Sequence, residues 1–428
     1  MKILVVGSGG REHTIIWKLS KSPLVDKIYA APGNAGISGM CKCIPIKIDE
    51  LESLANFVEK HKIDLTVVGP EVPLTLGIVD IFESRGLKIF GPTKLAAEIE
   101  GSKALAKEFM KKYHIPTASF KIFDKYEEAV DFVSANNVPL AIKADGLTAG
   151  KGAMICLNSK ESLKALESMM VTKVFGAAGT RVIIESILEG EEVSVMAFTD
   201  GKTIVPMISA QDHKRIFDGG LGPNTGGMGS YAPTKVVNDR MMKAIAVEIL
   251  EPTIEGLRQE GRLFKGVLYA GLMITEIGPK VIEFNCRFGD PETQVVLPLL
   301  QNDLAEIFMS IIDEELDLED ISWKEESAVC VVMASEGYPE KPITGRKIFG
   351  LKDLRRENCH IFHAGTARQK DGQLVSSGGR VLGIVATHRE LQKAIERAYI
   401  AVGKVSFEGM QFRKDIGHVV GGVKSSFF

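Results

Sequence analysis

Short apolar segments alternate with helical periods along the first hundred residues. The runs Lys2–Val6, Ile63–Val68 and Leu87–Phe90 predict buried strands, and the spacing of apolar positions predicts helices at Glu12–Leu19 and Val79–Ser84. This alternation is typical of an open parallel sheet, in which helices connect successive strands. Ligands of such sheets bind beyond the carboxyl ends of the strands, so the loops that follow the strands are the first candidates for a binding site.

The middle of the chain has a different pattern. Ser102 is placed to cap a helix that ends at Ile115-Pro116. A small antiparallel module with one helix is expected next, with strands at Leu140–Lys143, Ala153–Leu157, Val182–Glu185 and, just beyond the module, Val193–Phe198. A long helical pattern at 238–258 precedes two further strands, Val267–Thr275 and Lys280–Phe284.

These patterns predict three domains, which fits a chain of 428 residues. We expect an N-terminal α/β substrate-binding domain with an open parallel sheet at residues 1–101. A central domain at 102–320 should carry the antiparallel module, at about 119–190, as an inserted flap. A small C-terminal α+β domain should occupy 321–428, with strands at Ala328–Met333 and Arg380–Ala386 and a helix at His388–Tyr399.

The composition is that of an ordinary globular chain and excludes several classes of protein. Lys and Arg number 52 against 55 Asp and Glu, so the net charge of −3 removes the basic surface of a dedicated nucleic-acid binder. No apolar run approaches the ~20 residues of a transmembrane helix, so no membrane association is expected. The apolar start after Lys2 is too short for a signal peptide, and six scattered cysteines suit reduced thiols, which together predict a cytoplasmic protein.

A glycine loop, Gly7-Ser-Gly9-Gly10-Arg11, follows the first strand and opens a helix. Its backbone N–H groups can hold a phosphate at the positive end of the helix dipole. The dinucleotide-binding pattern fails here because Glu12 stands where the third glycine belongs and no acidic residue follows the second strand. Arg11 instead suits a monophosphate; a purely structural glycine turn is the alternative.

A second glycine loop, Gly146 to Gly152, resembles a P-loop but misses its spacing. Only three residues separate Gly146 from Gly150, and Gly152 replaces the Ser or Thr that would hold magnesium. Because a strand precedes and follows it, the loop is expected to be a flexible flap over a triphosphate. Lys143, at the end of the preceding apolar strand, supplies a fixed positive charge.

Two further segments complete a nucleotide site. The segment from Glu185 to Glu192 ends one strand and begins another. The free backbone groups of such an edge segment suit an adenine ring, and a carboxylate that follows can accept hydrogen bonds from ribose hydroxyls. In the strand Val281–Phe288, alternation places Glu283, Asn285 and Arg287 on one face and Ile282, Phe284 and Cys286 on the other. Carboxylate and amide oxygens are ligands that Mg²⁺ accepts, and Arg287 could stabilise a transferring phosphoryl group; a solvated strand face is the alternative.

With Lys103 and Lys143 ahead of the flap and Glu283-x-Asn285 after it, the middle of the chain resembles the ATP-grasp superfamily of carboxylate–amine ligases. The longer strings extend the resemblance nearly end to end. Within that superfamily, the chain is similar to the phosphoribosylamine–glycine ligase family through Gly7–His13, Ala144–Gly152, Gln211–Arg215, Gly222–Gly229 and Glu283–Glu292.

This resemblance implies ATP, with Mg²⁺ or Mn²⁺, as cofactor and glycine and 5-phosphoribosylamine as substrates, which would be joined through a glycyl phosphate in purine biosynthesis. It assigns catalysis to Arg287, Lys143 and Asp212, and the metal to Glu283 and Asn285. It places ATP on Lys103, Lys143, Gly150, Lys151, Gly152, Glu185, Leu188 and Glu192, with Glu191 a less favoured ribose ligand. It places the substrates on Gly9, Arg11, Asn34, Glu71, Lys214, Asn224, Thr225, Gly226, Gly227, Asp290 and Glu292.

The sequence departs from the superfamily in one place and leaves several hypotheses open. Many members carry another metal-binding carboxylate before the Glu-x-Asn pair, but Tyr269–Met273 offers none. Gly378-Gly-Arg380 is either a phosphate contact or a turn. Another ATP-grasp ligase or carboxylase, a dinucleotide-dependent oxidoreductase and a non-catalytic nucleotide-binding module are the competing functions. A monomer is expected, with a weak homo-oligomer as the alternative.

Overall fold

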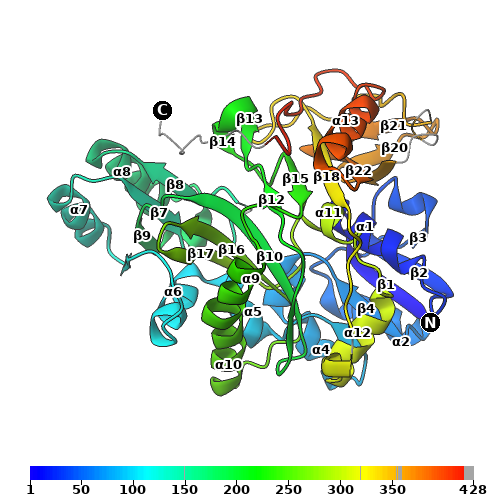
Figure 1. Ribbon diagram of the computed structural model, residues 1–428, viewed down its shortest axis with the longest axis horizontal. Coiled ribbons are helices and arrows are strands. Elements are labelled where there is room, and N and C mark those ends of the chain that lie inside the picture. Colours follow the sequence, from blue (N-terminus) through cyan, green and yellow to red (C-terminus); the bar gives the residue numbers. More distant parts are fainter. Residues whose placement is uncertain (149, 319, 353, 355–358, 419–428) are drawn as a thin grey trace.

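The computed structural model describes residues 1–428 except 149, 319, 353, 355–358 and 419–428. It begins with the expected parallel sheet, in the order β3-β2-β1-β4-β5, at one end of the molecule (Figure 1). Its strands are β1 (Lys2–Gly7), β2 (Lys27–Pro32), β3 (Lys42–Cys43), β4 (Leu65–Val68) and β5 (Ile89–Phe90). The associated helices are α1 (Gly10–Leu19), α2 (Leu51–His61), α3 (Glu71–Leu76), α4 (Ile78–Ser84) and α5 (Lys94–Gly101).

The expected antiparallel module lies at the opposite end of the molecule (Figure 1). Its sheet has the order β6-β9-β7-β8, with β6 (Phe120–Phe123), β7 (Leu140–Ala144), β8 (Ala153–Cys156) and β9 (Val182–Ser186). Its helices are α7 (Tyr126–Ala135) and α8 (Ser159–Leu166), which runs into a π-turn at Glu167–Val171. Helix α6 (Lys103–Lys112) leads into the module, and the Ser102 side chain caps α6 by accepting from the Leu105 N–H, as predicted.

A central antiparallel sheet, β11-β10-β16-β17, separates these two units. It consists of β10 (Glu191–Thr199), β11 (Ile204–Pro206), β16 (Gly266–Thr275) and β17 (Gly278–Asn285), with α9 (Asp239–Ile245), a π-turn at Ala246–Leu250 and α10 (Glu251–Gln259) as the long helical stretch. The register shifts within β17: Gly271 faces Glu283 but Leu272 faces Val281, so Ile282 is an extra residue in a bulge.

The bulge corrects one expectation from the sequence. Strict alternation puts Ile282 on the face of Phe284 and Cys286, but Val281 joins them in the core instead. The extra residue reverses which side chains face the core before Glu283. The Ile282 carbonyl accepts a hydrogen bond of 3.2 Å from Lys143 Nζ. The bulge thus connects the central sheet to the flap at the candidate nucleotide site.

The C-terminal sheet draws strands from two distant parts of the chain. Its order is β12-β15-β18-β22-β19, with β12 (Gln211–Asp212), β15 (Gly229–Ala232), β18 (Ser327–Ala334), β19 (Cys359–His363) and β22 (Arg380–His388). The remaining elements are the hairpin β13 (Arg215–Phe217) and β14 (Leu221–Asn224), the ribbon β20 (Thr366–Arg368) and β21 (Leu374–Ser376), and α11 (Thr293–Val296), α12 (Leu304–Asp313) and α13 (Leu391–Val402). Two strands from before residue 320 therefore complete the C-terminal sheet.

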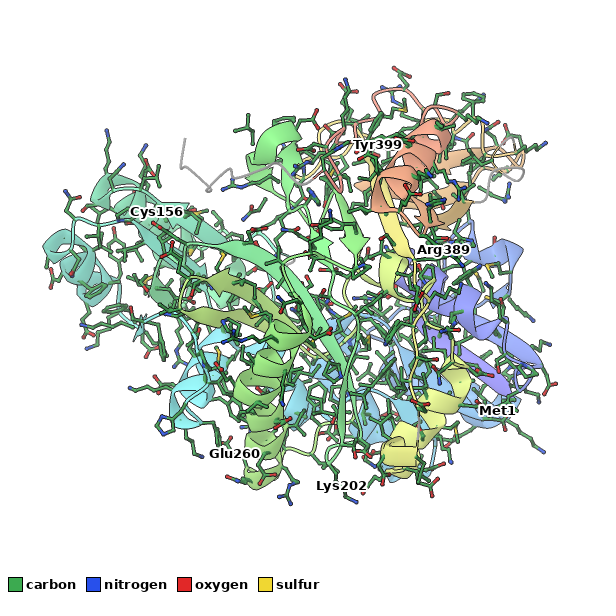
Figure 2. The ribbon with its side chains drawn as sticks, in the orientation of Figure 1. Met1, Cys156, Lys202, Glu260, Arg389 and Tyr399 are labelled. Atoms are coloured by element: carbon green, nitrogen blue, oxygen red, sulfur yellow. The ribbon has the colours of Figure 1, made fainter. Side chains whose placement is uncertain are left out.

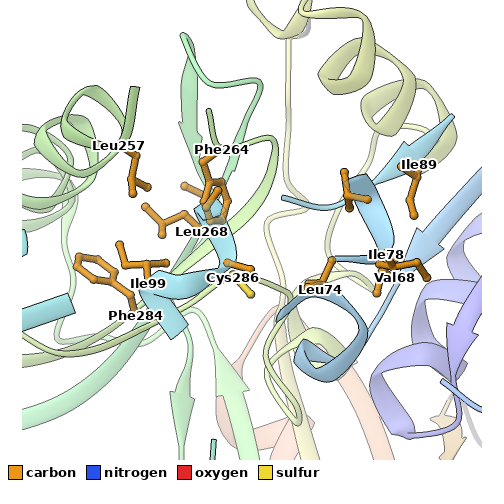
Figure 3. Packing of buried hydrophobic residues seen from close by; sticks show 14 of the residues in the cluster. Val68, Leu74, Ile78, Ile89, Ile99, Leu257, Phe264, Leu268, Phe284 and Cys286 are labelled. Atoms are coloured by element: carbon orange, nitrogen blue, oxygen red, sulfur yellow. The ribbon is translucent and has the colours of Figure 1, made fainter. Parts of the chain in front are cut away.

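Shared hydrophobic cores hold these units together. One core contains Val68 and Leu74 from the N-terminal unit and Leu268 and Phe284 from the central sheet (Figure 3). A second core joins the other face of the parallel sheet to the central and C-terminal sheets. Among the described residues, no helix combines the length and apolar character that crossing a membrane requires.

Aromatic and histidine side chains fill the contact between α1 and β19. Trp17 lies against His360, with ring centroids 4.5 Å apart, and the His363 N–H donates to His13 Nδ1 at 2.7 Å. Burial lowers the pKa of His13 to about 3, and burial with nearby lysines lowers the pKa of His360 to about 4. These histidines are therefore neutral at pH 7 where the N- and C-terminal units meet.

This interface should make the protein less stable in mild acid. The pKa of His360 is about 4 in the folded chain against 6.5 as the ordinary value, so the unfolded chain takes up its proton first as the pH falls. The contribution is complete above pH 6.5 and is lost toward pH 4. Between pH 7 and pH 5 the free energy of unfolding should fall in wild type. In His360→Phe this fall should be smaller by about 1–2 kcal/mol, measured by urea unfolding. His418→Phe, which replaces an exposed histidine, should keep the wild-type pH dependence; an unchanged dependence in His360→Phe would contradict the assignment.

Candidate active site

The N-terminal glycine loop is organised by the Glu12 side chain. The Glu12 carboxylate accepts from the Gly9 N–H and from Arg11 Nε, both at 2.5 Å, and is almost fully buried. A Cβ at Gly69, after β4, would lie 2.1 Å from Glu12 Oε1, so this close approach requires glycine. Glu12 therefore fills the space between the ends of β1 and β4, which explains physically why the loop departs from the dinucleotide-binding pattern.

Two predicted phosphate-binding residues make internal contacts. Arg11 is buried, and its Nη1 donates to the Phe288 carbonyl at 3.1 Å in addition to the Glu12 pair. Asn34 Nδ2 donates to the carbonyls of Ser8 and His363, both at 2.8 Å. Asn34 thus joins the glycine loop to the C-terminal unit.

The nucleotide side brings three predicted residues together. Lys143 Nζ lies 3.0 Å from the Glu185 carboxylate, and Lys103 Nζ donates to the Gly146 carbonyl at 2.8 Å. Burial lowers the pKa of Lys103 below its ordinary value, with Lys143 contributing. The two lysines and the start of the flap therefore share one region at the junction of α6, β7 and β9.

Sequence reasoning missed Lys107, which is 2% exposed on α6. Its Nζ pairs with Glu185 at 2.8 Å and donates to Thr117 Oγ1 at 2.7 Å, and burial lowers the pKa of Lys107 to about 8. Its position one helical turn after Lys103 was the available signal, because residues four apart share a helix face. Glu185 is consequently held by two lysines.

The metal candidates Glu283 and Asn285 end β17. Burial alone would raise the pKa of the Glu283 carboxyl, but three lysines outweigh burial and hold its pKa below the ordinary value: Lys214, Lys103 and Lys143. A carboxylate kept ionised beside an amide oxygen is a hard donor pair that fits Mg²⁺ or Mn²⁺. Among the described residues no group of three or more His, Cys, Asp and Glu side chains forms a metal cage, so phosphate oxygens and water would have to complete the coordination.

Arg287 lies beside this pair and is itself held by carboxylates. Its Nη2 lies 2.8 Å from Glu100 and 3.0 Å from Asn285 Oδ1, and its Nε lies 3.1 Å from Glu71. Sequence reasoning missed Glu100, a buried residue at the end of α5 that also accepts from the Cys286 N–H at 2.8 Å. These contacts fix the guanidinium of Arg287 next to the predicted metal site.

The acceptor side contains two buried carboxyl groups. Burial, reinforced by the Glu292 charge, raises the pKa of Asp212 well above its ordinary value. Asp212 Oδ1 is buried with no hydrogen-bond partner among the described residues, and a Cβ at Gly227 would lie 2.6 Å from it. Glu292 Oε1 accepts from Ser194 Oγ and from the Tyr269 hydroxyl, both at 2.9 Å. Among the described residues, Asp212 therefore offers an unpartnered carboxyl oxygen beside the loop backbone.

Lys214 connects the acceptor side to the nucleotide side. Its Nζ contacts the Glu192 carboxylate directly and lies 3.6 Å from Glu283 Oε1. Burial alone would lower the pKa of Lys214, but Glu192 and Glu283 raise it well above the ordinary value. The Thr225 hydroxyl donates to the Lys214 carbonyl at 2.8 Å, which orders the loop that contains Asn224 to Gly227.

The flap loop lies against both the central and the C-terminal units. Asp145 accepts from the Ser102 hydroxyl at 3.0 Å and from the Ala104 N–H at 3.1 Å. Lys151 Nζ donates to the Pro339 carbonyl at 2.9 Å, and the Gly152 N–H donates to Thr148 Oγ1 at 3.0 Å. Leu188 follows β9 in the segment that leads to β10, where the adenine edge was expected.

The sheet topology, the flap between β7 and β8, the paired lysines and Glu283-x-Asn285 at the end of a central strand define an ATP-grasp enzyme. Family models agree along the chain: residues 1–100 match the phosphoribosylglycinamide synthetase N domain, 101–293 its ATP-grasp (A) domain and 328–419 its C domain. The chain belongs to the phosphoribosylglycinamide synthetase family.

Curated relatives and a solved structure support this membership. The phosphoribosylamine–glycine ligase of Halalkalibacterium halodurans is 51% identical over 418 residues, 97% of this chain and 96% of that protein. The human trifunctional purine biosynthetic protein adenosine-3 is 47% identical over 97% of this chain, which corresponds to 42% of that protein. The crystal structure of phosphoribosylamine–glycine ligase from Thermotoga maritima superposes with a TM-score of 0.84 at 34% identity and covers 97% of this chain and 100% of that chain.

A more distant likeness concerns the fold alone. The biotin carboxylase domain of the Hydrogenobacter thermophilus 2-oxoglutarate carboxylase has a TM-score of 0.73 at 17% identity, over 96% of this chain and 91% of that chain. The sequence-based expectation of an N-terminal parallel sheet, an ATP-grasp core with a flap and a small C-terminal domain is confirmed.

The contact between Gly69 and Glu12 can be tested by stability. Gly69→Ala would place a methyl group 2.1 Å from Glu12 Oε1, so Glu12 must move and its bond from the Gly9 N–H must lengthen. We expect the free energy of unfolding to fall by about 1–3 kcal/mol, the usual effect of overpacking, in urea titrations. Gly39→Ala is the control because a Cβ there meets nothing within 4 Å. Equal stability of the two variants would show that Glu12 is not fixed in this position.

Proposed function

We propose that this ATP-grasp ligase joins glycine to 5-phosphoribosylamine and forms glycinamide ribonucleotide, ADP and phosphate. The observation that carries the proposal is the family match over all three units together with a site that combines nucleotide, metal and acceptor elements. The curated relatives named for this reaction match 97% of the chain, and the reaction belongs to purine biosynthesis.

In the first step an oxygen of the glycine carboxylate attacks the γ-phosphorus of ATP, and the bond to the bridging oxygen of ADP breaks. Lys103, Lys143 and Arg287 lie where they can balance the charge of the phosphates. Lys151, Gly150 and Gly152 of the flap would cover the phosphates, while Glu185 and the backbone near Leu188 would bind adenine. Glu192 would bind the ribose.

The divalent metal would be held by Glu283 and Asn285. Bound there, it supplies charge neutralisation for the phosphate oxygens. The protein contributes by keeping Glu283 ionised through its three neighbouring lysines and by holding Asn285 with Arg287. Tyr269–Met273 adds no carboxylate, so the ligands from this strand pair number two.

In the second step the amine nitrogen of phosphoribosylamine attacks the acyl carbon of glycyl phosphate. The bond from this carbon to the phosphate oxygen breaks, phosphate leaves and the nitrogen loses a proton. We place Asp212 as the proton acceptor because its Oδ1 has no hydrogen-bond partner among the described residues, and because a raised pKa makes its carboxylate a stronger base. Gly9 and Arg11 of the glycine loop, with Asn34 and Glu71, would hold the ribose phosphate. Lys214, Asn224 to Gly227, Asp290 and Glu292 would shape the acceptor side.

The setting of the enzyme is part of the same proposal. We infer a monomer in the cytoplasm, acting on small molecules, with domains at 1–101, 102–320 and 321–428. Six sparse cysteines and the absence of a basic surface in the composition support this setting. Size-exclusion chromatography with light scattering tests the monomer.

The reaction itself is tested by ADP release and by mass spectrometry of the product. The purified chain with Mg-ATP should form ADP and glycinamide ribonucleotide only when glycine and phosphoribosylamine are both present. ADP formation with another acid and amine, and none with these two, would refute the substrate assignment and favour a different ATP-grasp ligase.

The metal role is tested by Glu283→Gln, which keeps the shape of the side chain and removes its charge. We expect kcat to fall about 100-fold, as when a group that stabilises transition-state charge is lost. Binding of Mn²⁺ in the presence of a non-hydrolysable ATP analogue, followed by electron paramagnetic resonance, should weaken in parallel. Glu276→Gln, at the exposed β16–β17 turn, is the matched control and should behave as wild type. Full activity of Glu283→Gln would exclude the metal assignment.

A further inference from the structure

One residue of the acceptor-side loop, Gly226, is held through both of its backbone polar groups by the C-terminal domain. The Gly226 N–H donates to the Tyr338 hydroxyl at 2.9 Å, and the Gly226 carbonyl accepts from Arg380 Nη1 at 2.6 Å. Tyr338 follows β18 and Arg380 begins β22, so the two side chains come from separate segments of the C-terminal sheet. We refer to Tyr338 and Arg380 as the Gly226 clamp.

The clamp also reaches the N-terminal glycine loop. Arg380 Nη1 donates to the Asp290 carbonyl at 2.7 Å and lies 3.3 Å from Asp290 Oδ1. The Asp290 carboxylate in turn accepts from the Arg11 N–H at 3.3 Å and from Gln294 Nε2 at 2.7 Å. One guanidinium therefore links the two loops that would hold the amine substrate.

The sequence left the role of Arg380 open, and the structure shows what its side chain contacts. Its side chain is 23% exposed, and its hydrogen bonds within the described residues go to the backbone of Gly226 and Asp290. A planar guanidinium with several donors suits this bridging better than an ammonium. In this structure Arg380 therefore joins Gly226 to Asp290.

Gly226, the clamped residue, directly precedes Gly227, whose backbone approaches Asp212 closely. Gly227 has φ +110°, and a Cβ there would lie 2.6 Å from Asp212 Oδ1. A rotation of the Gly226 peptide would move Gly227 relative to Asp212. The flap meets the same place, because Lys151 Nζ donates to the carbonyl of Pro339, the residue after Tyr338.

We propose that Tyr338 and Arg380 are positioning residues for amine capture, which they serve by fixing the Gly226–Gly227 backbone against Asp212. The proposal rests on the proposed function and adds a role for the C-terminal domain in the second step. When the loop is displaced, water competes with the amine: its oxygen bonds to the acyl carbon, the bond to phosphate oxygen breaks, and glycine and phosphate are released. ATP is then consumed without product.

The experiment compares Tyr338→Phe, which removes one oxygen, with Tyr399→Phe. Tyr399 lies on α13 of the same domain (Figure 2), and its hydroxyl also bonds backbone groups, donating to the Arg413 carbonyl at 2.8 Å, but within the described residues it forms no hydrogen bond with the acceptor loop. Arg380→Lys keeps the charge and loses the bridging geometry. The readouts are KM for each substrate and the ratio of ADP to glycinamide ribonucleotide formed.

For Tyr338→Phe we expect KM for phosphoribosylamine to rise about fivefold, the range of one hydrogen bond, with KM for ATP unchanged. The ratio of ADP to product should rise from one to about two, and further in Arg380→Lys. Tyr399→Phe should keep wild-type values, because a role in folding alone lowers the amount of active enzyme without changing the ratio.

Two outcomes would overturn the inference, and they differ from failure of the proposed function. A ratio of one and an unchanged KM for the amine in Tyr338→Phe would refute the clamp while wild type still makes product. Failure of wild type to make glycinamide ribonucleotide would refute the proposed function and the clamp with it. If Arg380→Lys does not fold, Tyr338→Phe alone decides the question.

Discussion

The site depends on how charges are balanced where the flap, α6 and the central sheet meet. Four lysines face three carboxylates there: Lys103, Lys107, Lys143 and Lys214 against Glu185, Glu192 and Glu283. Charges withdrawn from water are tolerated only when they are paired. The region is therefore held together by ion pairs between different units of the chain.

The same constraint explains how the units of the chain are arranged around the site. Glu283 stays ionised because lysines from α6, β7 and the segment after β12 converge on it. The bulge at Ile282 aids this convergence, since the carbonyl of the extra residue accepts from Lys143. On the other side, Arg380 and Asp290 connect the N-terminal glycine loop to the loop at Gly226 through partly buried polar contacts. Each domain thus contributes side chains or backbone that the others need.

Local pattern was sufficient for much of the fold. Period-two and helical spacing predicted β1, β4 and β5 of the parallel sheet, β10, β16 and β17 of the central sheet, the Ser102 cap and the flap, because each depends on residues near one another in sequence. The inclusion of β12 and β15 in the C-terminal sheet was not predictable in this way, because it depends on pairing across about a hundred residues.

In the candidate site, too, local features were predictable from the sequence and contacts between distant residues were not. Glu283, Asn285, Lys143 and the glycine loops were found from spacing and residue type. Lys107, Glu100 and Tyr338 were missed because their roles come from partners far along the chain, as when Tyr338 meets Gly226. Ile282 was placed on the wrong face because a single extra residue in a strand leaves no mark in the alternation that precedes it.

The central claim is that the site phosphorylates a carboxylate and passes its acyl group to an amine. Transfer of label from glycine tests it most directly. With glycine carrying ¹⁸O in both carboxyl oxygens, each turnover should leave one ¹⁸O in the inorganic phosphate released and one in the amide, measured by mass spectrometry. Phosphate without label, formed in step with glycinamide ribonucleotide, would contradict the account.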